Sequence, residues 1–267
     1  MAPYDFKGPD ADVILRSTDG KEYHAHNFIP SLASPVFQGM FGLPQPAASP
    51  PQIPAIDLAE PSEILEPFIQ YLYPRSPPKI SDITAWAAVY AVADKYQAEG
   101  VMDSLRDTLL PKFLKASPFR VYTLASRWAF EEEAKIASTR TLTLDILKKL
   151  TPEDAELMGD AACRKLFLLH LNRREAVRAF IAQHPYPSAS GPACVCPPTP
   201  VLDLIPALCR RVGAKPSVTL EEVYKAATKG WSYLAPCGER CRFSHENKHK
   251  YFRSLAKGIS ALPLTFK

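Results

Sequence analysis

The residues best suited to chemistry are cysteines near the C-terminal end of the 267-residue sequence. Cys194 and Cys196 form a Cys-x-Cys pair, and Cys237 and Cys241 form a Cys-x₃-Cys pair about 40 residues later. A structural zinc ion takes four Cys or His ligands in a tetrahedron, usually as two chelating pairs. We therefore expect a structural zinc ion held by these four cysteines.

A second ligand set overlaps the first, because His245 and His249 follow the second cysteine pair. If residues 237–249 form a helix, the i, i+4 spacing places both cysteines and both histidines on one face. His245 could then replace one of the four cysteine ligands. The spacings match no named zinc finger, so unpaired thiols at or near the surface are the alternative.

Motifs of the common enzyme classes are missing from the sequence. It has no G-x-x-x-x-G-K-[ST] phosphate loop, no G-x-G-x-x-G, no H-E-x-x-H and no G-x-S-x-G. His24 and His26 lie two residues apart, and thus on one face of a strand, but neither a third metal ligand nor a nucleophile pattern accompanies them. We expect no catalytic residues, and we expect His26 to be a buried, hydrogen-bonded imidazole.

The composition is that of a globular protein, with 46% hydrophobic and 22% charged residues. No apolar run approaches the roughly 20 residues that span a bilayer, and the N-terminal residues lack an apolar stretch of signal-peptide length. We therefore expect the chain to fold in the cytoplasm or nucleus, where thiols stay reduced.

Positive charge is concentrated at the C-terminal end. Residues 184–267 hold 12 Lys and Arg against 5 Asp and Glu, whereas residues 1–183 hold 20 against 23. Between Arg240 and Lys257, six basic residues alternate with aromatic ones, a pattern typical of some nucleic-acid surfaces. An ordinary solvated helix has the same pattern and is commoner. A transcription-associated protein that binds nucleic acid is thus an alternative, and nucleic acid is not the partner we expect.

Turn and helix signals predict the order of the elements. Residues 12–16 and 22–26 flank an Asp-Gly turn and predict a β-hairpin, and residues 53–58 predict a short strand. Ser34 followed by Pro35 is a helix N-cap with an N1 proline. Further helices are expected at about 60–72, 82–99 and 101–115, twice within 117–150, and from 152 to about 183. We expect Pro111 to kink or divide its helix.

Proline-rich stretches divide the chain into segments. Residues 184–200 cannot sustain a helix and predict a linker. The expected organisation is a first domain at 10–115, a helical region at 116–183, this linker, and a small basic helical segment at 201–267 that zinc could stabilise.

The first domain resembles the BTB/POZ family. Asp12 to Leu15 resembles the family's first strand, and Tyr23 to Phe37 resembles its signature of a hydrophobic residue, a small residue, His, and a helix ending in Ser with Phe three residues later. Met40-Phe41 and Phe68 to Tyr73 match the ends of two family helices. The resemblance implies an α+β fold of short strands flanked by helices, followed here by a mainly α-helical C-terminal region. The layout also resembles fungal BTB-domain proteins that have a helical extension and a Cys-containing C-terminal segment.

The resemblance implies a protein–protein interaction module rather than an enzyme. Many BTB domains form homodimers through their first helices, so the chain is expected to be a homodimeric scaffold or adaptor that contacts itself and other proteins. The residues expected at the partner or dimer surface are Phe28, Leu32, Val36, Phe37, Met40 and Phe41.

A substrate adaptor of a cullin-type ubiquitin ligase is the other role that the resemblance implies. Family members that bind cullins commonly carry an acidic residue beside a hydrophobic one in the loop before the third main strand. The stretch from Gln38 to Ala55 contains no Asp or Glu. No kelch, MATH or zinc-finger array is attached either, which weakens the case for a cullin adaptor.

Overall fold

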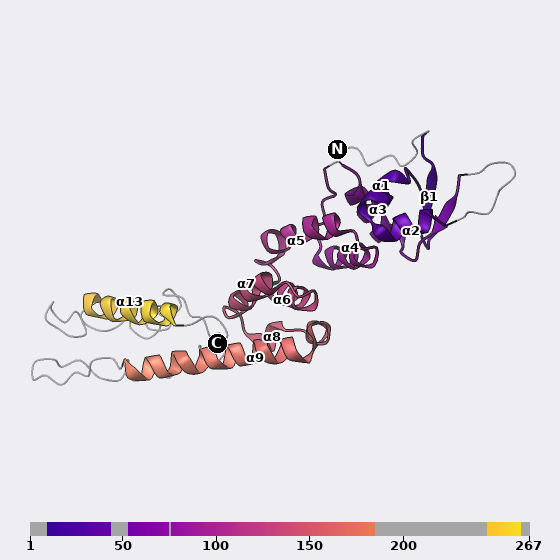
Figure 1. The fold of residues 1–267 in the computed structure, drawn as a ribbon. Helices are drawn as coiled ribbons and strands as arrows, with labels where there is room; N and C mark the ends of the chain where they lie inside the picture. The colour runs from indigo at the N-terminus through magenta and orange to yellow at the C-terminus, as the bar shows by residue number, and fades with distance from the viewer. Residues whose placement is uncertain (1–9, 44–52, 75, 185–244, 263–267) are drawn as a thin grey trace, which may run out of the picture. The chain divides into compact units, whose positions relative to one another are not determined.

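The structure, a computed structural model, describes residues 10–43, 53–74, 76–184 and 245–262. The chain divides into two compact units, Met1–Lys115 and Ala116–Lys267. Figure 1 shows that the strands all lie in the N-terminal unit, and that the described part of the other unit is helical.

A three-stranded sheet forms one side of unit 1. Strand β1 (Val13–Arg16) pairs antiparallel with β2 (Glu22–Ala25) and parallel with β3 (Ala55–Asp57), which gives the order β2-β1-β3. Gly20 has a φ of +80° in the hairpin turn, a conformation that L side chains rarely adopt. The predicted hairpin and the third strand are therefore confirmed.

Among the described residues of unit 1, five helices accompany the sheet: α1 (Phe28–Ala33), α2 (Pro35–Phe41), α3 (Ser62–Leu72), α4 (Ile83–Lys95) and α5 (Glu99–Phe113). Helix α3 contacts α1 and α4, and α4 contacts α5. Trp86 lies fully buried between α4 and α5, where its indole Nε1 donates to the carbonyl of Leu105 at 3.1 Å. The helices thus share one core with the inner face of the sheet.

Pro111 does not divide its helix, because α5 continues through Pro111 to Phe113, and the alternative of a kink there stays a prediction. A proline inside a helix removes one backbone hydrogen bond and crowds the preceding turn. Here only two helical residues follow it, and Phe113 is buried, so packing of the last turn outweighs the lost bond.

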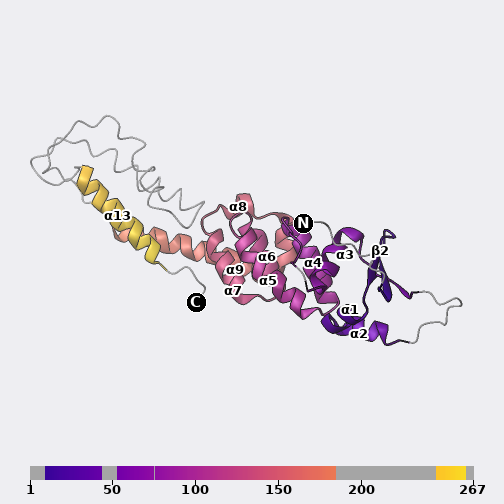
Figure 2. The same cartoon turned by 90° about the horizontal axis from the view of Figure 1, so that it is seen from above.

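Unit 2 is built on one long helix. Its described elements are α6 (Pro118–Arg127), α7 (Glu131–Thr141), the one-turn α8 (Ile146–Lys149), α9 (Pro152–Gln183) and α13 (His245–Ala261). Helix α6 packs on α7 and α9, and α13 contacts α9 (Figure 2). The two helices predicted within residues 117–150 are present, with α8 as an additional turn.

Helix α9 begins where the sequence predicts, because the Thr151 side chain accepts a hydrogen bond from the Asp154 amide at 3.1 Å. Gly159 interrupts the helical backbone with φ 75° and ψ 164°, so the regular helix starts again at Asp160. In the residues that the structure describes, no helix combines the length and the hydropathy that a membrane span requires. The predicted fold class, short strands flanked by helices and then a mainly helical region, is confirmed.

Candidate interaction surface

Ser34 fixes the junction between α1 and α2. Its hydroxyl accepts a hydrogen bond from the Phe37 amide at 3.1 Å and donates to the carbonyl of Tyr96 at 2.5 Å. Pro35 at the first position of α2 has a φ suited to helix entry. The predicted N-cap is confirmed, and its second hydrogen bond also ties both helices to the end of α4.

His26 lies at the corner between β2 and α1, next to Tyr73 at the end of α3. The His26 amide donates to the Tyr73 hydroxyl at 3.1 Å, and the imidazole Nδ1 lies 3.3 Å from the same oxygen. The prediction of a hydrogen-bonded imidazole is confirmed, but the prediction of burial is wrong, since the side chain is 34% exposed. The sequence indicated its partner Tyr73 only as the last residue of the stretch that resembles the end of a family helix.

Two large apolar side chains on α1 point into solvent. Phe28 and Leu32 are 70% and 77% exposed, and their i, i+4 spacing places them on one face of the helix. Val36, Met40 and Phe41 on α2 are half-buried. These five residues, named here the α1–α2 surface, are the predicted partner residues that remain accessible.

Phe37 does not belong to this surface, which corrects the sequence prediction. Its side chain is fully buried and stacks on Tyr96 and Phe68, with ring centroids at 4.7 and 6.4 Å. Stacked aromatic rings of this kind bury a large apolar area. Phe37 therefore anchors α2 to α3 and α4 instead of contacting a partner.

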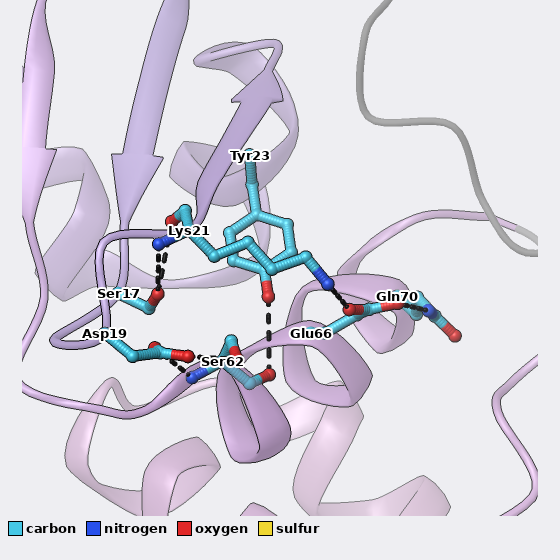
Figure 3. A network of polar contacts seen from close by, with 7 residues as sticks. All are labelled: Ser17, Asp19, Lys21, Tyr23, Ser62, Glu66 and Gln70. Carbon is cyan, nitrogen blue, oxygen red and sulfur yellow. Dashed lines mark hydrogen bonds and ion pairs between the residues drawn. The ribbon is translucent and has the colours of Figure 1, made fainter.

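A polar network holds the β1–β2 turn against the start of α3 (Figure 3). The Asp19 carboxylate accepts from the Ser62 amide at 2.8 Å and from the Ser62 hydroxyl at 2.5 Å. These hydrogen bonds hold the pKa of Asp19 far below its ordinary value. Lys21 pairs with Glu66 of α3 on the same side. Asp19 thus caps a helix whose own N-cap residue, Pro61, has no side-chain donor or acceptor.

Glu60 forms a second polar contact, which is largely buried. It accepts from the Tyr96 hydroxyl at 2.8 Å and pairs with Lys95 at 2.5 Å. Burial, followed by the hydrogen bond to Glu60, raises the pKa of Tyr96. A paired carboxylate of this kind fastens α4 to the loop before α3, and this accounts for Glu60 without a catalytic role.

The predicted zinc ligands are not tested by the structure. Cys194, Cys196, Cys237 and Cys241 lie outside the described residues, and His245 lies in α13 without a described side chain. Within the described ranges, no three His, Cys, Asp or Glu side chains form a group that could hold a metal ion. The zinc site stays a prediction.

Comparison with known protein families agrees with the architecture of unit 1. A model of the BTB/POZ domain matches residues 6–112, which span the whole sheet and nearly all of the five helices of that unit. A search of curated proteins returned no match to the chain.

Proposed function

The chain carries a BTB/POZ domain, a protein–protein interaction module, at residues 6–112, and on this premise we propose that it acts as a homodimeric scaffold or adaptor. The proposed contact between two copies is the α1–α2 surface. A closed dimer presents the same patch twice, related by a two-fold axis. The chain then works by holding partners together, with no reaction of its own.

The exposure of Phe28 and Leu32 supports this proposal most strongly. Single exposed apolar residues are common on protein surfaces, whereas two large ones on the same helix turn that continue into a half-buried apolar patch mark contact sites. Covering a leucine or phenylalanine side chain yields about 1.5–3 kcal/mol each. Four such side chains, two from each copy, give this contact a strong driving force.

The experiment is the substitution Leu32→Glu in the full chain, with the molar mass followed by sedimentation equilibrium. A charge at the centre of the contact would lose its water on association, so we expect a tight dimer in the wild type and, in the variant, the loss of that dimer with at most a much weaker association. Leu147→Glu is a matched control, because Leu147 of α8 is also 77% exposed. A wild type that stays monomeric over a wide concentration range would refute the proposal, as would dimerisation that Leu32→Glu leaves unchanged.

The identity of the protein that binds the chain would distinguish a scaffold from a ubiquitin-ligase adaptor. We place the cullin adaptor second, because only the family resemblance supports it and no acidic residue lies between Gln38 and Ala55. Co-purification with a cullin-type scaffold would reverse this order. Salt-dependent binding of duplex DNA to the full chain would instead favour the nucleic-acid alternative. We propose the cytoplasm or nucleus as the location.

Zinc is the one cofactor we propose, as a structural ion in the C-terminal segment. The support is the spacing of Cys194, Cys196, Cys237 and Cys241, with His245 as an alternate ligand. Elemental analysis of the purified chain should find about one zinc per chain. Cys237→Ser should lower this content, whereas the control Cys163→Ser should not, since Cys163 is a half-buried thiol of α9. A metal-free wild type would remove the proposal.

A further inference from the structure

Helix α9 has apolar residues on two opposite faces. One face packs into unit 2 through the buried residues Leu166, Leu169 and Val177. On the other face, Phe167, Leu168 and Leu171 are 41%, 46% and 48% exposed. At 3.6 residues per turn these three side chains lie within an arc of about 100°, on the side away from the core. Their exposed parts make an apolar patch on the outer side of the helix.

Charged residues flank this patch in a regular order. Asp160 and Arg164 precede it, and Glu175 and Arg178 follow it, all four exposed. At the helical repeat these charges fall in the same arc as the apolar residues. The outer stripe of α9 therefore consists of Asp160, Arg164, Phe167, Leu168, Leu171, Glu175 and Arg178.

When a second copy of the outer stripe runs in the opposite direction, each charge of one stripe faces an opposite charge of the other. In an antiparallel pair of α9 helices centred between Leu169 and His170, Arg164 faces Glu175 of the other copy, and Asp160 faces Arg178. Leu168 faces Leu171 at the centre. A two-fold axis repeats each contact, so the pair would have four ion pairs around one apolar centre. A parallel pair would instead place each charge opposite its own copy.

From this complementarity we propose that α9 self-associates: the outer stripe binds the same stripe of a second copy of the chain in antiparallel orientation. The occupant is identified by charge as well as by hydrophobicity, because every charge of the stripe has an opposite charge at the same distance from the midpoint to within one residue. The inference does not rest on the α1–α2 surface, which belongs to the other unit.

The C-terminal helix leaves the stripe open. Helix α13 contacts the opposite side of α9, where Arg173 donates to the Ile259 carbonyl at 2.6 Å and Tyr251 donates to the His184 carbonyl at 2.7 Å. Arg173 is buried, on the core side of α9. A second copy can therefore approach the stripe while α13 stays in place.

The expected contact is small. From Asp160 to Arg178 the stripe is about 27 Å long at 1.5 Å per residue. Three apolar residues per copy bury less surface than a standard stable interface. We therefore expect weak association, on the order of micromolar, that ionic strength weakens further by screening the flanking charges.

A charge swap tests the orientation directly. In the full chain with Leu32→Glu, which removes the proposed contact of the other unit, Arg164→Glu should raise the dissociation constant of self-association roughly tenfold. Glu175→Arg should do the same, and the double variant should recover the original value. Residues 164 and 175 are about 16 Å apart along one helix, so only a second chain can provide this recovery.

A local effect within the helix cannot imitate the result. Arg178 donates to Glu175 within the same helix at 3.1 Å, and that contact is absent from both Glu175→Arg and the double variant. Its loss can weaken association but cannot restore it. Circular dichroism of each variant checks that α9 remains helical, which these exposed substitutions should not change.

Each outcome of the experiment decides one proposal. Recovery in the double variant supports antiparallel α9 pairing. Failure to recover, or a strictly monomeric Leu32→Glu chain whose wild type dimerises, overturns the α9 proposal and leaves the α1–α2 dimer standing. If Leu32→Glu does not change self-association at all and the charge swap does, the α1–α2 proposal fails and the α9 proposal stands.

Discussion

His170 is the residue that most directly couples the fold of unit 2 to pH. Its side chain is almost fully buried, its Nε2 lies 3.0 Å from the Thr141 hydroxyl, and its ring stacks against Phe119. Burial, and then the nearby positive charge of Arg174, lower the pKa of His170 to about 4. The imidazole is therefore neutral in the folded chain at physiological pH.

This shift predicts that unit 2 loses stability in mild acid. Below the ordinary histidine pKa of 6.5 the unfolded chain binds a proton, while the folded chain stays neutral until pH falls to about 4. Stability should thus fall as pH drops through this window, by up to about 3 kcal/mol. His170→Gln removes the titrating group. As the pH falls from 7 to 4, the urea midpoint of the variant should therefore rise relative to that of the wild type.

The comparison with His170→Gln isolates one group, because all other titrating residues are common to both chains. If the two urea midpoints change in parallel over the whole window, the imidazole is not the source of the acid sensitivity. A wild type that is stabilised in mild acid relative to the variant would contradict the direction of the shift.

At the scale of single elements, the contact between α9 and α13 depends on a residue without a side chain. Gly258 of α13 lies against the ring of Phe180, and a Cβ atom at Gly258 would overlap that ring. Around this contact α13 buries Phe252, Leu255 and Ile259, three residues on one face of the helix. Close approach at Gly258 is what lets this apolar face reach α9.

Gly258→Leu should therefore release α13 from α9. Rotation of Phe180 can accommodate one added carbon but not a branched side chain, so the apolar face of α13 would be separated from its partner. We expect the backbone amides of residues 250–261 to exchange hydrogen at least roughly tenfold faster. Ser260→Leu, at an exposed position of the same helix, is the control and should leave exchange unchanged. Equal exchange in both variants would show that Gly258 is not part of the contact.

The positions of several elements could be predicted from the sequence. The β1–β2 hairpin and the starts of α2 and α9 depend on local signals, the Asp-Gly turn and the N-caps Ser34 and Thr151, and all three are where the sequence placed them. Local signals determine backbone conformation over a few residues. They do not report which side of an element is covered, because that depends on residues far away in the sequence.

For this reason, the burial of a side chain is harder to predict from the sequence than the backbone conformation. Phe28 and Phe37 belong to the same apolar run, yet one is 70% exposed and the other fully buried, because only Phe37 reaches Phe68 and Tyr96. In α9, Leu168 and Leu169 are neighbours of the same residue type, yet Leu168 is 46% exposed and Leu169 is buried. Helical periodicity finds such faces but does not tell a core face from a contact face when both are apolar.

At the scale of the whole molecule, the described residues form two hydrophobic cores, one in each unit. Leu65 of α3 is fully buried in unit 1, and Leu166 of α9 is fully buried in unit 2. The BTB/POZ model ends at residue 112, close to the boundary between the units at Lys115. A unit with its own core can unfold by itself, so the free energy of unfolding has one value for each unit.

This division predicts that core substitutions act on one unit only. Leu65→Ala and Leu166→Ala each remove the same buried atoms, and each should destabilise its own unit by about 2–5 kcal/mol. Hydrogen exchange in increasing urea separates the two effects, because α3–α5 amides report unit 1 and α6–α9 amides report unit 2. Each variant is the control for the other. If Leu65→Ala speeds exchange in α6–α9 as much as in α3–α5, the two cores unfold together, and a partner bound to either unit would stabilise the whole chain.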